Sequence, residues 1–181
     1  MIAPYGTWKS PITPSLITGE SVGLAAIAFA GQDLCWLEQR PREAGRTVLV
    51  RNGADLTPPG YSVRSHVHEY GGGAFTVTGN DVIFVNDTDQ QLYHAPSVVN
   101  RHATPLTNFL GRRFADMLID RHRIIAVCED HRGAGHEPVN SLVAITGNQI
   151  ETLAACLRRS SRLPHMESSE HAMGRNRVMA R

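Results

Sequence analysis

The sequence predicts an all-β protein, because one type of strand-like run occurs three times in similar surroundings. The runs occupy residues 34–38, 82–86 and 125–129, and each has four apolar residues followed by a polar one. They begin 48 and then 43 residues apart, and each follows a turn rich in Gly, Asn, Asp or Arg. Short apolar runs bounded by turn residues are typical of buried β-strands.

Each run belongs to a unit of four predicted strands. A period in the forties with four strands per unit is typical of β-propeller blades, whose second strand lies between neighbouring blades and is apolar on both faces. The predicted fold class is therefore all-β, a partial β-propeller of about three four-stranded blades. An all-β sandwich with accidental spacing is the alternative. The expected strands are 24–29, 34–38, 48–50 and 56–57; 74–78, 82–86, 92–94 and 105–107; and 114–119, 125–129, 142–145 and 150–153.

Three blades alone would leave two apolar faces open, whereas propellers typically close with about four to eight blades. We therefore expect part of a larger protein, with a partial propeller at 21–153 and blades at approximately 21–60, 61–108 and 109–153. Residues 1–20 contain three prolines among aromatic residues, which predicts an extended arm. Residues 154–181 follow neither a strand period nor a helix period, which predicts a disordered basic tail or an out-of-frame segment.

The composition excludes several classes of protein. A formal net charge of +1 gives no reason to expect nucleic acid or an anionic membrane as a partner. The three cysteines, Cys35, Cys128 and Cys156, have neither disulfide nor metal spacing, which favours a reducing cytoplasm. No signal peptide is recognisable, and the longest apolar window, 22–30, is too short for a membrane span.

The densest cluster of chemically versatile side chains lies in residues 63–74, where His66, His68, Glu69 and Tyr70 precede three glycines. Alternate histidines on a strand would share a face, so a metal site is one interpretation. The carboxylate of Glu69 would point to the other face, which favours a structural role in which the imidazoles and the Tyr70 hydroxyl bond to the turn between blades. The glycines predict a sharp turn and a close backbone approach, and no phosphate cradle, since a strand follows them.

The topology of an up-and-down blade predicts a rim. The loop between the second and third strands lies at the same end as the connection between blades, so segments 40–46, 61–73 and 129–137 should meet there. The rim is either a polar surface that contacts a peptide or another domain, or a solvated loop surface. Its predicted members are Arg42, Arg46, His66, His68, Glu69, Asp130, His131, Arg132, His136 and Glu137.

Residues 19–23 match the Gly-x-Ser-x-Gly pattern of a nucleophile elbow. An elbow requires a core strand before the serine and a helix after it, with an Asp and a His further along the chain. Strand-like residues follow Ser21 here, so we do not expect Ser21 to be a nucleophile.

Several stretches, in chain order, resemble one family. They are APYGTWKSPIT at 3–13, WLEQRP at 36–41, VRSHVHEYGGGA at 63–74, EDH at 129–131 and EPVN at 137–140. They are similar to the N-terminal β-propeller of prolyl-oligopeptidase-family serine peptidases, of the dipeptidyl aminopeptidase and acylaminoacyl peptidase type. The resemblance covers about residues 3–153 and fails over the tail.

This resemblance implies a cytoplasmic serine peptidase in which the propeller caps a C-terminal α/β-hydrolase domain and admits only short peptides. The matching residues include no member of the Ser-Asp-His triad, so we expect a truncated chain that is inactive as a hydrolase alone. No catalytic residue, metal or cofactor is predicted. A free-standing propeller-like binding module and a metal-binding β-barrel protein are the alternatives. The residues expected to contact substrate or the hydrolase domain are His66, His68, Glu69, Tyr70, Asp130, His131 and Glu137.

Overall fold

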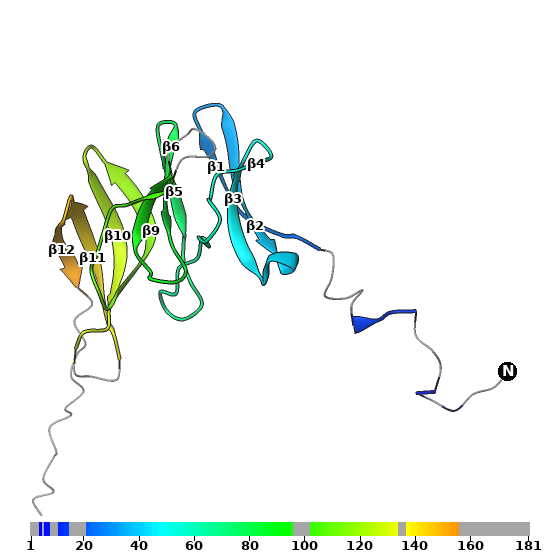
Figure 1. Cartoon of the computed structure of the whole chain (residues 1–181). Coiled ribbons are helices and arrows are strands. Elements are labelled where there is room, and N and C mark those ends of the chain that lie inside the picture. Colours follow the sequence, from blue (N-terminus) through cyan, green and yellow to red (C-terminus); the bar gives the residue numbers. More distant parts are fainter. Residues whose placement is uncertain are drawn as a thin grey trace, which may run out of the picture.

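The computed structural model describes residues 4, 6–7, 11–14, 21–95, 102–133 and 137–155. Their strands form three separate antiparallel sheets of four strands each, in which every strand pairs with its neighbours in the sequence (Figure 1). The predicted class, a partial β-propeller of three four-stranded blades, is confirmed, and the sheets are neither a two-layer sandwich nor one closed barrel.

Blade 1 contains β1 to β4, blade 2 contains β5 to β8 and blade 3 contains β9 to β12. A short 3-10 helix, η1, follows β2. The bounds are β1 Gly23–Ala30, β2 Asp33–Arg40, η1 Pro41–Glu43, β3 Arg46–Arg51, β4 Ala54–Asp55, β5 Phe75–Thr78, β6 Asp81–Val85, β7 Leu92–Ala95, β8 Thr104–Pro105, β9 Arg112–Asp120, β10 Arg123–Asp130, β11 Val139–Thr146 and β12 Gln149–Ala155.

Each of the predicted first three strands of a blade overlaps an observed strand. The short fourth strands β4 and β8 end at Asp55 and Pro105, two residues before the predicted ends, so β4 does not overlap the predicted strand 56–57. The reason is the same in both blades. The Thr57 hydroxyl accepts the N–H of Leu49 at 2.9 Å, and the Thr107 hydroxyl accepts the N–H of Leu92 at 2.9 Å. A side-chain oxygen thus replaces the backbone partner that a longer strand would supply.

The third repeated run is one residue out of register with the other two. In each blade the residue after the first turn starts the second strand, so Asp33, Asp81 and Arg123 are equivalent. Ile124, rather than Ile125, therefore corresponds to Val82 of blade 2. The apolar pattern could not reveal this shift, because Ile124 and Ile125 are both apolar.

The core lies between the blades. In β6, Val82 and Phe84 pack in the cluster shared with blade 1, whereas Ile83 and Val85 pack in the cluster shared with blade 3. Successive residues of a strand point to opposite faces of its sheet. Blade 1 covers one face of blade 2 and blade 3 covers the other, which explains why β6 is apolar on both faces.

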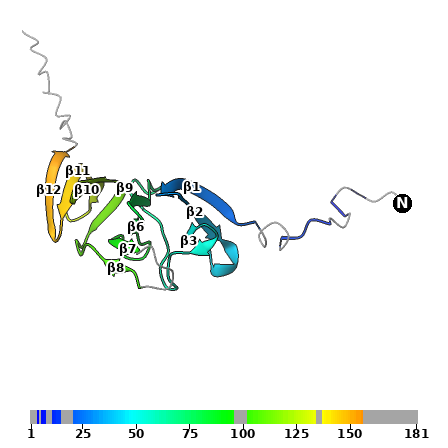
Figure 2. The same ribbon diagram turned by 90° about the horizontal axis from the view of Figure 1, so that it is seen from above.

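Figure 2 shows the three sheets fanned side by side, with blade 2 between blades 1 and 3. Most of the predicted arm and nearly all of the predicted tail lie outside the described residues, although β12 continues to Ala155. In the part of the chain that the structure describes, no helix is long and apolar enough to cross a membrane.

Candidate functional site

Residues 63–74, the inter-blade segment, connect blade 1 to blade 2 and bond to both. The N–H of Val63 donates to the carbonyl of Thr47 in β3 at 2.9 Å. The next N–H, that of Arg64, donates to the carbonyl of Val85 in β6 at 3.1 Å. Consecutive backbone groups of the segment therefore hold two blades together.

The same segment then reaches blade 3. The buried Ser65 hydroxyl donates to the carbonyl of Phe114 in β9 at 2.7 Å, and the N–H of Val67 donates to that hydroxyl at 3.2 Å. Val67 itself is 1% exposed. A segment that joins blades 1 and 2 in the sequence thus fixes all three blades in space.

The three glycines explain how the segment passes so close to its neighbours. Gly71 has φ +90°, and a Cβ there would lie 2.8 Å from the carbonyl oxygen of Ser65. A Cβ at Gly72 would lie 2.8 Å from that of Ala115. The N–H of Gly73 donates to Asp116 Oδ1 at 2.7 Å. The predicted sharp turn and close backbone approach are both present, and strand β5 follows them.

The ring of His66 and the backbone N–H of His68 contact different blades. His66 Nε2 bonds to Asp87 in the β6–β7 loop, and the N–H of His66 donates to Gln90 Oε1 at 2.7 Å. The N–H of His68 instead donates to Glu129 Oε1 of blade 3 at 3.1 Å. Residues 67–70 form a turn rather than a strand, so the shared face assumed for a metal site does not exist. Among the described residues, no group of three or more His, Cys, Asp or Glu side chains could hold a metal ion.

Asp87 and Glu129 occupy equivalent places in blades 2 and 3, since each lies six residues after the start of its second strand. Each accepts a hydrogen bond from one histidine of the segment. His66 makes this contact with its ring and His68 with its backbone N–H, so the two carboxylates are used in different ways.

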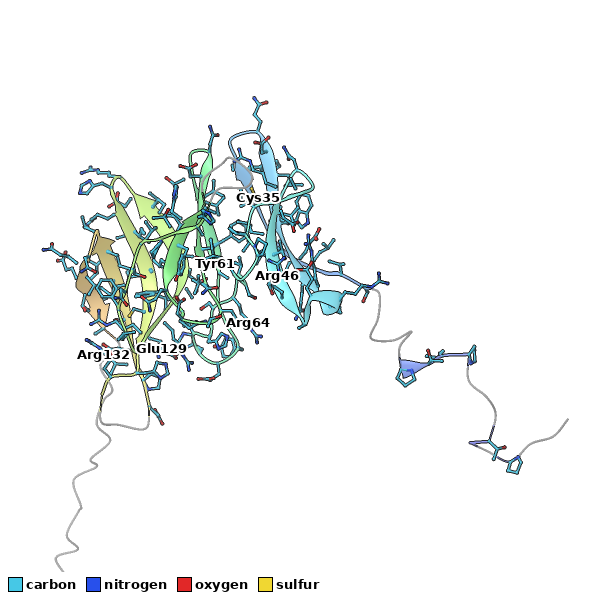
Figure 3. All side chains as sticks on the ribbon, viewed as in Figure 1. Cys35, Arg46, Tyr61, Arg64, Glu129 and Arg132 are labelled. Carbon is cyan, nitrogen blue, oxygen red and sulfur yellow. The ribbon has the colours of Figure 1, made fainter. Side chains whose placement is uncertain are left out.

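Glu129 is the most buried ionisable group of the site, at 2% exposed. Its Oε2 lies 2.8 Å from His131 Nε2 and 3.4 Å from Arg113 Nη1. A buried carboxylate requires such partners, because desolvation of an unpaired charge is costly. Figure 3 shows Glu129 and Arg132 at one end of blade 3, with Arg64 toward the same end of the fan.

Arg113 ties the segment to Glu129. Its Nη1 also donates to the carbonyl of His66 at 3.0 Å and to Glu69 Oε1 at 2.6 Å. The hydrogen bond from Arg113 holds the pKa of the exposed Glu69 carboxyl below its ordinary value. Arg113 therefore favours the ionised form of Glu69.

The backbone of this turn is strained. His68 and Glu69 have φ +57° and +65°, in the left-handed region that side chains other than glycine adopt reluctantly. Such conformations cluster at functional sites and persist only where the surroundings hold them. Here Glu129 and Arg113 hold the turn, and the next residue, Tyr70, is left 86% exposed.

The expectation that the Tyr70 hydroxyl bonds to the turn is wrong. Its ring lies against that of His68, with centroids 5.8 Å apart, and the hydroxyl has no hydrogen-bond partner among the described residues. The left-handed residues before Tyr70 turn its side chain outward. The structure therefore presents an aromatic ring on the surface beside a carboxylate and an imidazole.

The other predicted site residues lie on or beside the end of β10. Arg132, whose side chain bonds to Asp130, and Arg112 of β9 together lower the pKa of the Asp130 carboxyl. The N–H of His131 donates to the carbonyl of Gly111 at 2.8 Å. Glu137 is exposed, and His136 lies outside the described residues.

Part of the predicted rim is joined by contacts. Arg46 donates to the carbonyl of Tyr61, just before the segment, at 3.2 Å, and His66, His68 and Glu69 contact blades 2 and 3. Sequence reasoning missed Asp87, Gln90 and Arg113. Asp87 and Gln90 lie in the loop between the second and third strands of blade 2, and the topological rule, applied to that loop, could have found them. Arg113 has no sequence signal that could have found it.

No activated nucleophile is found in the described residues. Burial raises the pKa of the Cys128 thiol to about 11 and also raises that of Cys35, so neither is a thiolate near neutral pH. Strand β1 begins two residues after Ser21, and the helix that a nucleophile elbow needs does not follow.

Neither the protein-family models nor the sequences of curated proteins give a match. Solved structures do match, among them the following two. A Mycobacterium tuberculosis puromycin-hydrolyzing peptidase is 30% identical with a TM-score of 0.72, over 85% of this chain. A puromycin hydrolase is 28% identical with a TM-score of 0.72, over 84% of this chain. The chain spans 27% of the length of each.

These matches show the class of protein: the described residues form a propeller segment like that of peptidases. The resemblance to the propeller of prolyl-oligopeptidase-family peptidases is confirmed, and the two solved relatives are named for puromycin hydrolysis.

Proposed function

We propose that this chain is part of the substrate-gating propeller of a prolyl-oligopeptidase-like serine peptidase that acts on short peptides in the cytoplasm. Hydrolysis would be carried out by an α/β-hydrolase domain, and the propeller would restrict access to it. The observation that carries the proposal is the match to two puromycin-hydrolysing enzymes over about five-sixths of this chain at 28–30% identity.

The site supports a binding role rather than a catalytic one. Tyr70 and Glu69 are exposed on a turn that Glu129 and Arg113 hold in a strained conformation. A rigid aromatic ring beside a charged group is a common anchor at binding surfaces, because little side-chain entropy is lost on contact. We assign to His66, His68, Glu69, Tyr70, Asp130, His131 and Glu137 the contact with the peptide or with the hydrolase domain.

A chimera tests this function. The region of the M. tuberculosis peptidase that matches this chain is replaced by the matched residues of this chain, and hydrolysis of puromycin, a tripeptide amide and casein is measured. We expect hydrolysis of the two small substrates within about tenfold of the parent enzyme and none of casein, because the propeller admits only small molecules. A chimera that melts cooperatively but hydrolyses nothing, or that digests casein, would contradict the proposal.

The rim is tested within the same chimera. Tyr70→Ala should raise KM by about tenfold with little change in kcat if Tyr70 contacts bound peptide, since only uniform binding is lost. His122→Ala is the matched control, because His122 is also an exposed ring but lies in the turn between β9 and β10, at the end of the blade opposite the β10–β11 loop. Equal effects of the two substitutions would remove Tyr70 from the binding surface.

A further inference from the structure

A hollow of about 270 Å³ opens between blades 2 and 3, at the end of the fan opposite the rim. The turn between β9 and β10 and the turn between β11 and β12 both border it. The β9–β10 turn lies at the top of Figure 1, whereas the loop that follows β10 lies at the bottom. The residues that line the hollow belong to blades 2 and 3 alone, so it is separate from the exposed outer faces of the fan.

The floor of the hollow is apolar. Ile83 of β6 and Ile145 of β11 belong to the core between the two blades and are 6% and 1% exposed. Leu106, Ile119 and Ile124 pack against that core but are only half-buried. The core between blades 2 and 3 therefore reaches the surface at this point.

The junction between blades 1 and 2 is bridged at the same end. Arg51, the last residue of β3, binds Asp33 of its own blade through Nη2 at 2.5 Å. Its Nη1 also donates to the carbonyl of Asn80, in the turn between β5 and β6, at 2.6 Å. One guanidinium thus spans from blade 1 to the turn of blade 2.

His94 occupies the place of Arg51 in blade 2, since each pairs with the third residue of the second strand of its blade. His94 Nε2 lies 3.0 Å from Asp81 Oδ2, which reproduces the contact between Arg51 and Asp33. An imidazole reaches less far than a guanidinium on its longer stem, and the hollow borders both His94 and the β9–β10 turn. The shorter side chain at this position of the repeat accounts for the opening between blades 2 and 3.

The mouth of the hollow carries a free positive charge. Arg123 binds Asp120 at 2.5 Å, and His94 binds Asp81, so both carboxylates at the mouth already have partners. The exposed Arg121 has φ +56° and lines the hollow. Within the part of the chain that the structure describes, its guanidinium forms neither a hydrogen bond nor an ion pair.

We propose that this hollow binds a small carboxylate with an apolar body. The guanidinium of Arg121 donates to the carboxylate, and the apolar body covers the floor and displaces water from it. A mostly apolar pocket with a few polar groups that fix orientation is the usual form of a small-molecule site. The site is independent of the peptidase proposal, because no residue of the predicted rim borders it.

Two sources share this chemistry, a short fatty acid and the C-terminal residue of an apolar peptide, and the probes distinguish them. Hexanoate represents the first and N-acetylphenylalanine the second, and each is titrated into the full-length protein by ligand-observed NMR. We expect a Kd of about 0.1–1 mM for the preferred acid, as suits ligands of this size. The neutral amide of each acid should bind about tenfold more weakly, and so should acetate, which lacks the apolar body.

Arg121→Gln should weaken binding of the preferred acid by about tenfold, because the charge-assisted contact is lost while the apolar floor remains. Arg64→Gln is the matched control, since Arg64 is also an exposed arginine but lies in the inter-blade segment. An unchanged cooperative melt shows that both variants fold. Equal binding of acids and amides, no binding at about 10 mM, or equal effects of the two substitutions would overturn the proposal.

Discussion

Blade 2 and its two neighbours carry the same kind of apolar second strand in different surroundings. Phe84 of blade 2 is fully buried, whereas the equivalent Trp36 of blade 1 borders an open hollow. The difference shows that each repeat encodes a second strand with apolar residues on both faces, even where the residues given supply a neighbouring blade on only one side. Residues that look identical in the sequence pattern therefore differ in what they contribute to stability.

The largest expected effect follows from this contrast. Phe84→Ala should reduce the free energy of unfolding by about 3–5 kcal/mol, because it leaves a cavity between blades 1 and 2 and removes the ring contacts with Tyr61 and Tyr93. Trp36→Ala should cost only about 1 kcal/mol, since part of its surface stays in water. Urea unfolding of both variants measures the difference, and equal losses would show that Trp36 is covered as fully as Phe84.

The next effect concerns the glycines of the inter-blade segment. Gly71→Ala should reduce the free energy of unfolding by about 2–4 kcal/mol, because the added Cβ meets the Ser65 carbonyl oxygen and the residue keeps a positive φ. Gly133→Ala is the control: no atom lies within 4 Å of its added Cβ, so the change should stay within about 0.5 kcal/mol. If the two variants unfold at the same urea concentration, the segment is not held as closely as described.

A third comparison uses the equivalent carboxylates of blades 2 and 3. Glu129→Ala should reduce the free energy of unfolding by about 2–3 kcal/mol, because the N–H of His68 and the Nη1 of Arg113 lose a hydrogen-bond acceptor. Asp87→Ala should cost less than about 1 kcal/mol, since the side chains of Asp87 and His66 are 32% and 37% exposed. Urea unfolding of both variants compares the two losses of free energy of unfolding, and a larger loss in Asp87→Ala would contradict the prediction.

The smallest effect is a pH dependence within blade 2. The hydrogen bond from the Tyr93 hydroxyl to Asp89 Oδ2, at 2.6 Å, raises the pKa of Tyr93 to about 12 from an ordinary value of 10.0. The raised pKa means that folding favours the neutral phenol. The contribution of the neutral Tyr93 hydroxyl to the free energy of unfolding is therefore fully present below pH 10 and is lost as the pH rises toward 12. Ultraviolet titration of the phenol should show this, and Asp89→Asn should move the midpoint back toward 10.

Much of the fold follows from the sequence because the blade repeats. A strand between two sheets must be apolar on both faces, and the turns around it need Gly, Asn or Asp, so the pattern locates β2, β6 and β10 within one or two residues. The register of blade 3 could not be obtained in this way, because Ile124 and Ile125 satisfy the pattern equally well.

The sequence predicted where the candidate site lies, but it predicted only some of the contacts within it. Topology brought His66, His68 and Glu69 to the rim with Asp130 and His131. The partners that hold them were decided in three dimensions: Arg113 comes from a strand that has no motif, and the left-handed backbone before Tyr70 faces its ring outward. No local pattern encodes a side chain that acts across some 45 residues of intervening chain.

The sequence by itself thus determined the blades, their number and the resemblance to a peptidase propeller, since these depend on periodicity and on short motifs. Only the tertiary structure decided that residues 63–74 fasten three blades, and that apolar side chains such as Ile27 of blade 1 and Leu118 of blade 3 stay exposed. Both depend on which sheet packs against which, and packing between sheets is set by side chains that meet from distant parts of the chain.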